Sequence, residues 1–444
     1  MRYDVRVVQR GVGLKQWGHI GCLALALMAG LLCPDPSRLR LRLLGRPAFA
    51  PEPVPHPERD AARQRFRLHV EPYRVLGLGE PGHGPQHIEE PDGLIFDSKG
   101  RLLATDAGNF RVQMWDVRSG EHLGSFGSPA LFQGGEIVNL ALSPDGTLLV
   151  SDEKRGRIYA FAPKGGEAGA PAYVPIERSQ PADVVYKKLG GILVDSQRSF
   201  YTVDADLNDV RKFSWDGTRD PRWRFPAKRT AKDPFLRNPE GIAIDEPNHI
   251  LYVASEFDYV IHLFHSDTGE YLGKSIGARM DPATHALSGK PIFSGSPSIY
   301  SGSPEGLSLL FGYLFAIDEF GGHVHVFDTR SDAVWNRDVD DLVALLDAAG
   351  GDRRKTGYLG FFGHTPVLHT ENLPHKKQIR QHLLNPADYN PPGDLCSPDS
   401  VATYYDAAGQ EGYIAVADQC NYRIIVYRWS DFARAAEIDP SPRR

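Results

Sequence analysis

Short apolar blocks separated by polar breaks run from Asn238 to Gly277, in the stretch NPEGIAIDEPNHILYVASEFDYVIHLFHSDTGEYLGKSIG. The blocks have the length of strands and are rich in β-branched residues, as expected where both faces of a sheet are buried. The breaks contain Pro-Asn and Asp-Thr-Gly sequences that favour turns. The pattern predicts four strands, at Ile242–Ile244, Ile250–Ala254, Val260–Phe264 and Tyr271–Ile276.

The same pattern occurs six times along the chain. The six units begin at Pro91, Val138, Leu189, Asn238, Pro304 and Pro398. One unit cannot bury its own faces, and a period of roughly 40–50 residues with four strands is typical of a propeller blade. We therefore predict an all-β, six-bladed β-propeller of four-stranded blades over 67–432. The blades are expected at about 90–127, 136–175, 185–226, 238–277, 303–330 and 397–430.

Two further segments complete the predicted propeller. Tyr73–Gly79 resembles a fourth strand without a blade of its own, whereas the last unit ends at its third strand, Arg423–Trp429. We expect these two strands to pair, because this closure leaves no open sheet edge between the first and last blades. Residues 331–396 are expected to form an insertion that contains a helix at Asp338–Ala349, and 433–444 are expected to form a tail.

The N-terminal residues have the layout of an export signal. A basic segment, 1–17, precedes an apolar run at 18–33, and a linker rich in Pro and Arg follows at 34–66. This layout predicts a signal peptide or an uncleaved membrane anchor within 1–33. The protein is therefore expected to be extracytoplasmic, either periplasmic or secreted, or anchored through 18–33.

The net charge bears on the choice of partner, and the placement of two cysteines predicts a disulfide. The 444-residue chain has a formal net charge of −6, which gives no electrostatic case for binding nucleic acid. Cys396 precedes the first strand of the last unit and Cys420 follows its second strand, so antiparallel pairing brings them together. In an exported protein we expect a disulfide between them, with two free thiols as the alternative.

Carboxylates recur at two positions of the repeat, and both positions are expected at one mouth of the central channel. Asp92, Glu240, Glu305 and Asp399 open first strands. The ends of the second strands, or the positions next to them, carry Asp106, Asp152, Asp204, Glu256, Asp318 and Asp418. Crowded carboxylates favour a hard cation, calcium first, although an Asp after a strand can instead cap a turn. The predicted calcium ligands are Glu240, Glu305, Asp399, Asp92, Glu256 and Asp318.

The repeats resemble NHL-repeat propellers of the TolB-like, six-bladed kind over nearly all of 73–430. The C-terminal half is also similar to calcium-dependent β-propeller phytases, and the residues that carry this likeness are Glu240-Gly241, Asp245-Glu246, Leu251-Tyr252-Val253-Ala254, Glu256, Glu305-Gly306 and Asp399-Ser400. The resemblance implies that Glu240, Glu305 and Asp399 face a calcium cluster that binds phosphate.

Phosphate binding also requires cations at the mouth. Arg111, Lys154 and Arg155 lie in the second turns of the first two blades and are the predicted substrate-binding residues, although basic side chains in turns are often merely solvated. The sequence departs from the phytases in the third blade. Leu189 stands where they have Tyr, and the turn 204–208 has no basic residue.

Three functions remain open from the sequence, and none of them assigns a catalytic residue. The first is a calcium-dependent, phytase-like hydrolase of a small phosphorylated substrate. The second is a non-catalytic propeller that binds a peptide, a polymer or a protein partner at the channel mouth. The third is a calcium lactonase of the gluconolactonase type, for which the candidate residues are Asp92, Asn139, Glu240 and Glu305.

Overall fold

The computed structural model describes residues 61–132, 134–164, 173–177, 180–181, 184–226, 235–281, 284–293, 303–363 and 395–442. The chain divides into two compact units, Met1–Phe49 and Ala50–Arg444, and all described residues belong to the second. The expected signal or anchor and most of the linker lie outside the described residues. Within these ranges, no helix is both long enough and apolar enough to cross a membrane.

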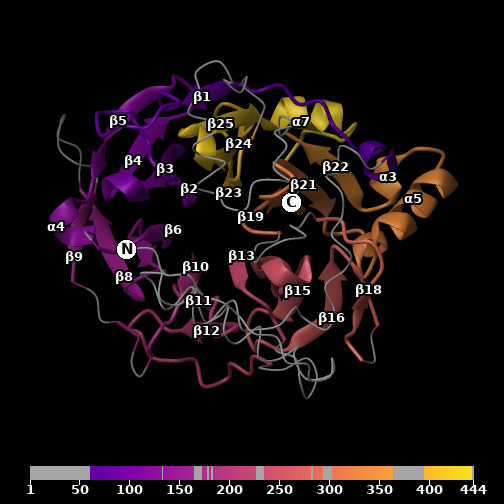
Figure 1. Ribbon diagram of the computed structural model, residues 1–444, viewed down its shortest axis with the longest axis horizontal. Coiled ribbons are helices and arrows are strands. Elements are labelled where there is room, and N and C mark those ends of the chain that lie inside the picture. Colours follow the sequence, from indigo (N-terminus) through magenta and orange to yellow (C-terminus); the bar gives the residue numbers. More distant parts are fainter. Residues whose placement is uncertain are drawn as a thin grey trace, which may run out of the picture. The chain divides into compact units, whose positions relative to one another are not determined.

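Six small antiparallel sheets follow one another around a common centre and form a six-bladed β-propeller, as the repeats predict (Figure 1). Blade one contains β2 (Leu94–Phe96), β3 (Arg101–Asp106), β4 (Arg111–Asp116) and β5 (Glu121–Phe126). Blade two contains β6 (Ile137–Leu142), β7 (Leu148–Asp152), β8 (Arg157–Pro163) and β9 (Tyr173–Ile176). Blade three has three strands in its described part, β10 (Leu189–Val194), β11 (Phe200–Asp204) and β12 (Asp209–Phe213).

The remaining blades have four strands each. Blade four contains β13 (Pro239–Asp245), β14 (Ile250–Ser255), β15 (Val260–His265) and β16 (Tyr271–Ile276). Blade five contains β19 (Leu307–Leu310), β20 (Tyr313–Asp318), β21 (His323–Asp328) and β22 (Tyr358–Phe362). Blade six contains β23 (Pro398–Asp406), β24 (Glu411–Asp418), β25 (Arg423–Arg428) and β1 (Arg74–Leu76).

Strand β1 closes the ring as predicted. It pairs antiparallel with β25 in the register Arg74↔Val426, Val75↔Ile425 and Leu76↔Ile424. The segment before β1 contacts blade five, where the backbone N–H of Leu68 donates to the carbonyl of Phe361 at 2.8 Å. The N-terminal part of the propeller domain is therefore bound to the last two blades.

The expected insertion is partly a component of blade five. Strand β22 lies inside 331–396 and pairs with β21, so blade five continues beyond residue 330. Helix α5 (Val339–Ala348) occupies the predicted position and begins with a capping box between Asp338 and Asp341. Residues 364–394 lie outside the described ranges.

The other regular elements are short and peripheral. They include the helices α3 (Ala61–Gln64), α4 (Pro129–Phe132) and α7 (Trp429–Ala435), the two-stranded ribbon of β17 (Arg279–Met280) and β18 (Leu287–Ser288), and several single-turn 3-10 helices.

The hydrophobic core lies between blades. Six apolar clusters each join the facing sheets of two neighbours; blades four and five, for example, share Tyr252, Leu263, Leu314 and Phe361, all fully buried. Corresponding clusters join every other adjacent pair, including blades six and one. Because each sheet is covered by its neighbours, the stability of any blade depends on closure of the ring.

We expect closure to depend on Leu76, whose side chain is 2% exposed in the cluster between blades six and one. Leu76→Ala should lower the free energy of unfolding by about 2–5 kcal/mol, because it leaves a cavity there. Val75→Ala, on the 40%-exposed neighbouring position of the same strand, should change it by less than about 1 kcal/mol. Urea unfolding of both variants checks this, and equal effects would contradict the proposed role of closure.

Candidate functional site

The first strands of the blades lie closest to the centre of the ring, and glycines at their starts allow them to approach each other (Figure 1). The backbone N–H of Gly306 in blade five donates to the carbonyl of Asp399 in blade six at 3.0 Å. A Cβ on Gly241 would lie 1.9 Å from the carbonyl oxygen of Glu305, and a Cβ on Gly306 would lie 2.6 Å from that of Asp399. We call the end of the ring where the first strands begin the mouth.

A repeated turn fixes the register of the second-strand carboxylates. In every blade, the fourth residue after the end of the second strand has a left-handed backbone; these residues are Phe110, Gly156, Asn208, Tyr259, Gly322 and Tyr422. Counted back from this residue, the strand ends are Asp106, Asp152, Asp204, Ser255, Asp318 and Asp418. Glu256 therefore lies one residue after its strand end, Ser255, whereas the five Asp residues lie at theirs.

The Asp residues at the strand ends are buried turn and loop contacts. Asp106, Asp152, Asp204, Asp318 and Asp418 are 0–1% exposed. Asp106 accepts from the backbone N–H of Glu89 at 2.7 Å, and Asp418 accepts from that of Cys396 at 2.7 Å, so each ties the chain entering its blade to the second turn. Asp318, a predicted calcium ligand, accepts from the Gly321 N–H at 2.8 Å and contacts His325 Nε2 at 3.2 Å.

In blades four and five, the residue after the strand end is a glutamate whose side chain contacts residues outside the turn. In blades four and five this residue is Glu256 and Glu319, which are 3% and 4% exposed. With Glu305 they form a group in which one carboxylate oxygen from each residue lies within 4.8 Å of the other two. Sequence reasoning identified Glu256 and Glu305 but missed Glu319. Aligning the blades on the left-handed turn residue places Glu319 at the same position as Glu256, because each lies three residues before it.

Lys188 brings a positive charge to this part of the mouth. Its Nζ lies 2.6 Å from Glu240 Oε1 and 3.9 Å from Glu153 Oε1. Burial lowers the pKa of Lys188, but Glu240, Glu153 and Glu256 outweigh it and raise the pKa above its usual value, so the amine stays charged. Sequence reasoning missed this residue, which immediately precedes the first strand of blade three.

Hydrogen bonds connect the Lys188–Glu240 pair with the group of Glu256, Glu305 and Glu319. Asn238 donates through Nδ2 to Glu240 Oε1 at 3.1 Å and also to Glu256. Ser397 Oγ donates to Glu319 Oε1 at 2.5 Å. A continuous polar network therefore extends along the mouth from blade three to blade six.

Asp92 and Asp399 form a second acidic pair, between blades one and six. Burial, and then the neighbouring Asp399 carboxylate, raise the pKa of Asp92 well above its usual value. Gln419 Nε2 donates to Asp92 Oδ1 at 2.5 Å and partly offsets this rise. The pair is expected to hold a proton at pH values where an exposed Asp has lost it.

The predicted phosphate-binding cations are engaged in other contacts. Arg111 Nε lies 2.7 Å from Asp106 Oδ2, and its Nη2 donates to the carbonyls of Gly84 and His87, each at 2.8 Å. Arg155 Nη1 donates to the Leu131 carbonyl at 3.0 Å and to the Tyr159 hydroxyl at 2.9 Å. Lys154 is exposed and lies 2.7 Å from Glu136 Oε2. These contacts hold loops, so Lys188 is the stronger candidate for an anion contact near the glutamates.

The two cysteines lie side by side, as their strands require. Cys396 and Cys420 are buried free thiols, and the Cys420 N–H donates to the Cys396 carbonyl at 3.1 Å. The disulfide stays a prediction.

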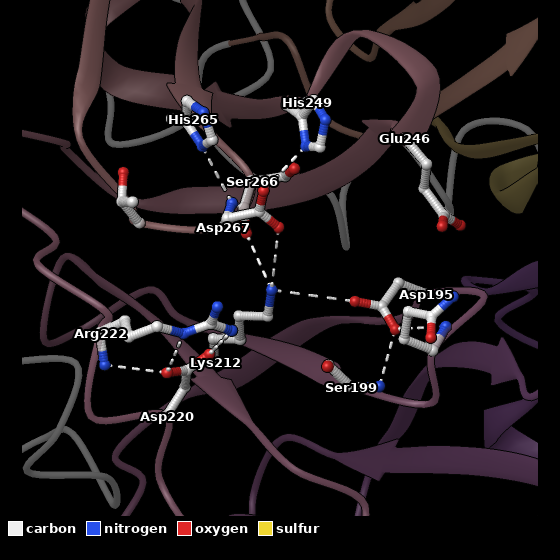
Figure 2. Close-up of polar contacts among 12 residues, drawn as sticks. Asp195, Ser199, Lys212, Asp220, Arg222, Glu246, His249, His265, Ser266 and Asp267 are labelled. Atoms are coloured by element: carbon white, nitrogen blue, oxygen red, sulfur yellow. Dashed lines mark hydrogen bonds and ion pairs between the residues drawn. The ribbon is translucent and has the colours of Figure 1, made fainter.

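A separate polar cluster lies between blades three and four (Figure 2). Lys212 on β12 is 3% exposed, and its Nζ donates to the Ser266 carbonyl at 3.1 Å. Asp195 Oδ2 and Asp267 Oδ1 lie 3.9 and 3.8 Å from the same nitrogen. Asp195 follows the end of the first strand, away from the mouth, so this cluster joins two blades and does not belong to the candidate site.

Comparisons with known proteins agree with the repeat pattern. No protein-family model matches the chain. A 145-residue segment is 36% identical to NHL repeat-containing protein 3 of Homo sapiens and 33% identical to that of Mus musculus, covering 32% of this chain in each case. The chain spans 40% of the length of these curated relatives. Together with the six sheets, this likeness shows that the protein is an NHL-type six-bladed β-propeller.

Solved structures give only distant likenesses. The PQQ-bound aldose sugar dehydrogenase of Streptomyces coelicolor has 14% identity and a TM-score of 0.44, covering 81% of this chain and 98% of that one. A streptogramin B lyase has 14% identity and a TM-score of 0.42, covering 80% and 96%. At these scores, neither likeness identifies a site or a reaction.

We expect Lys212→Met to lower the free energy of unfolding by about 3–5 kcal/mol, because it leaves the Asp195 and Asp267 carboxylates without their buried cation. The matched control is Lys274→Met. Lys274 is 41% exposed and lies 3.5 Å from a largely exposed Asp332, so its loss should cost less than about 1 kcal/mol. Chemical denaturation of both variants measures the difference, and similar values for the two lysines would refute it.

The raised pKa of Asp92 predicts a pH dependence. Between the usual pKa of Asp, about 3.9, and the higher folded value, the folded state binds more protons than the unfolded state. The wild-type stability should therefore fall as pH rises through this window, and Asp92→Asn should remove that part of the loss. Urea unfolding with a chelator present, between about pH 4 and about pH 8, should show the variant gaining on the wild type as pH rises.

Asp116→Asn serves as the control of opposite sign for that experiment. Burial raises the pKa of Asp116, but the backbone N–H groups of Ser119 and Arg118 lower it further than burial raises it. In a series extended below about pH 4, this variant should lose ground against the wild type as pH rises to the ordinary pKa of Asp, about 3.9, and the difference should be constant above it. A constant difference between Asp92→Asn and the wild type at all pH values would rule out the shared proton.

Proposed function

We propose that the protein is a calcium-dependent binding propeller whose mouth holds an anionic ligand. The observation that carries the proposal is the convergence of Glu256, Glu305 and Glu319, whose oxygens lie within 4.8 Å of one another. These are oxygen donors only, which favours a hard cation such as Ca²⁺ over a transition metal.

The geometry fits a single ion. Ca²⁺ accepts oxygen ligands at about 2.3–2.6 Å, so oxygens up to about twice that distance apart can share one ion. Glu256 and Glu319 are nearly fully buried, and a cation between like charges this close would lower their mutual repulsion. Glu240 is held by Lys188, and Asp92 and Asp399 form their own pair, so these three carboxylates are not counted among the ligands of the proposed ion.

The anionic ligand is inferred from Lys188. Its ammonium group contacts Glu240, and Asn238 donates to both Glu240 and Glu256, so Lys188 is joined through these contacts to one of the proposed ligands. When bound, calcium would supply positive charge on one side of a phosphate or carboxylate group. Lys188 would contact the same group once Glu240 releases part of its interaction.

Phosphomonoester hydrolysis is the second candidate. It is favoured by the combination of clustered glutamates with Lys188, together with the resemblance of the Glu240, Glu305 and Asp399 segments to calcium-dependent phytases. The loop contacts of Arg111 and Arg155 count against it, because they leave fewer cations for a phosphate. Lactone hydrolysis and binding of a peptide, polymer or protein partner become outcomes of the test below.

An extracytoplasmic location, expected from the segment 18–33, is part of this proposal. Extracellular calcium modules work with dissociation constants of about 10⁻⁴–10⁻³ M, which a site with three protein carboxylates can reach. The proposal therefore concerns a protein that meets millimolar calcium rather than one that senses cytosolic calcium.

Calcium should raise the melting temperature of the wild type, since the unfolded chain cannot assemble the three ligands. At 100 times the dissociation constant, the gain in stability is about 2.7 kcal/mol. Glu305→Gln should abolish the gain. Glu246→Gln should keep it, because Glu246 follows the end of β13 that is opposite to the mouth, where it contacts Ser196. A melting temperature indifferent to both calcium and chelator would reject the site.

The ligand is tested with the same proteins. para-Nitrophenyl phosphate and a simple lactone are supplied with and without calcium, and Lys188→Met is compared with the wild type. Weaker binding of phosphate by Lys188→Met, with an unchanged calcium response, supports the proposed anion contact, and equal phosphate binding rejects it. Calcium-dependent turnover of the phosphomonoester would make the protein a phosphomonoesterase. Turnover of the lactone alone would make it a lactonase. Calcium binding without turnover of either compound supports the binding propeller.

A further inference from the structure

The buried cysteine pair lies directly beside the acidic mouth. Cys396 is followed by Ser397, whose hydroxyl donates to Glu319 Oε1 at 2.5 Å. Cys420 is preceded by Gln419, whose amide donates to Asp92 Oδ1 at 2.5 Å. Each thiol is therefore one residue away from a side chain that holds a mouth carboxylate in place.

The backbone brings the two thiols together. Pro398 pairs with Asp418 at the end of the β23–β24 ladder, and the Cys420 N–H donates to the Cys396 carbonyl beyond it. The Cys396 N–H also donates to Asp418 Oδ1 at 2.7 Å, which fixes the entry into blade six. The two thiols contact each other, and this contact contributes to the Cys396 pKa.

The environment of the pair favours a lasting bond over a rapidly reversible one. Cys396 is 4% exposed and Cys420 is 3% exposed. Burial, followed by the neighbouring Cys420 thiol, raises the pKa of Cys396 well above its usual value. A buried, protonated thiol exchanges slowly, so a bond made while the chain folds would persist in the native state.

We infer that Cys396 and Cys420 are a disulfide site, and that their oxidation fixes Ser397 and Gln419 and so strengthens cation binding at the mouth. The second part rests on the proposed function. The oxidant is a small-molecule disulfide such as glutathione disulfide: two protein thiols lose two electrons and two protons, one protein S–S bond forms, the S–S bond of the reagent breaks, and two small thiols are released.

The coupling has a simple physical basis. Ser397 has a left-handed backbone, with φ of 46°, which a non-glycine residue holds only when its surroundings constrain it. A covalent bond between its neighbour and Cys420 restricts this turn and the turn that carries Gln419. Both side chains then stay directed at Glu319 and Asp92, and less ordering remains to be done when a cation binds.

The test uses the full chain with Cys22 and Cys33 replaced by Ser, so that only the pair can react. The protein is refolded with reduced glutathione alone or with glutathione disulfide. The mass of each form, and its alkylation after denaturation, are then measured without reductant, so that burial does not protect a free thiol. We expect the oxidised form to lack two hydrogens and to resist alkylation. Two alkylatable thiols, after refolding and after treatment of the native protein, would overturn the first part.

Calcium affinity is then compared between the two forms by titration calorimetry. The oxidised form should bind calcium at least about fivefold more tightly, and the advantage should be absent in Cys420→Ser treated in the same way. Equal affinities of the oxidised and reduced forms would overturn the coupling. If neither form binds calcium, the coupling falls together with the proposed function, whereas the mass measurement still decides the disulfide independently.

Discussion

The burial of apolar surface between neighbouring sheets is the constraint on which the structure depends. Among the described residues, six clusters of buried apolar side chains are each shared by two neighbouring blades, so each sheet depends on its neighbours to cover its faces. A row of such sheets would leave two apolar faces exposed at its ends. Pairing of β1 with β25 removes those ends, which explains why a three-residue strand near the N-terminus belongs to the last blade.

Closure of the ring also determines where the charges lie. The first strands must approach one another near the centre, and glycines such as Gly241 and Gly306 allow backbone atoms of adjacent blades to come into contact. Acidic residues adjoin these glycines in the sequence, so their side chains gather at one end of the ring. The electrostatic cost of this arrangement is reduced by Lys188 at Glu240, and the raised pKa of Asp92 beside Asp399 favours protonation of that pair. For Glu256, Glu305 and Glu319, a cation would have the corresponding effect.

Carboxylates one residue apart in the repeat have different roles. Asp318 is buried in the turn and bonded to Gly321 and His325, whereas Glu319 lies with Glu256 and Glu305 at the mouth. The change of direction follows from the alternation of side chains along a strand and from the turn that begins there. The carboxylates that recur in almost every blade therefore hold turns together, and those present in only some blades form the candidate site.

The sequence by itself determined the six repeats, the closing strand Tyr73–Gly79 and the helix at Asp338–Ala349, because periodicity, turn residues and caps are local signals. It also indicated that Glu240, Glu256, Glu305 and Asp399 lie near one mouth. Only the tertiary structure decided which carboxylates converge, that Lys188 joins them, that β22 completes blade five, and that Arg111 and Arg155 hold loops. These outcomes depend on contacts between different blades or across long connections, and the distances that create such contacts are set only when the ring closes.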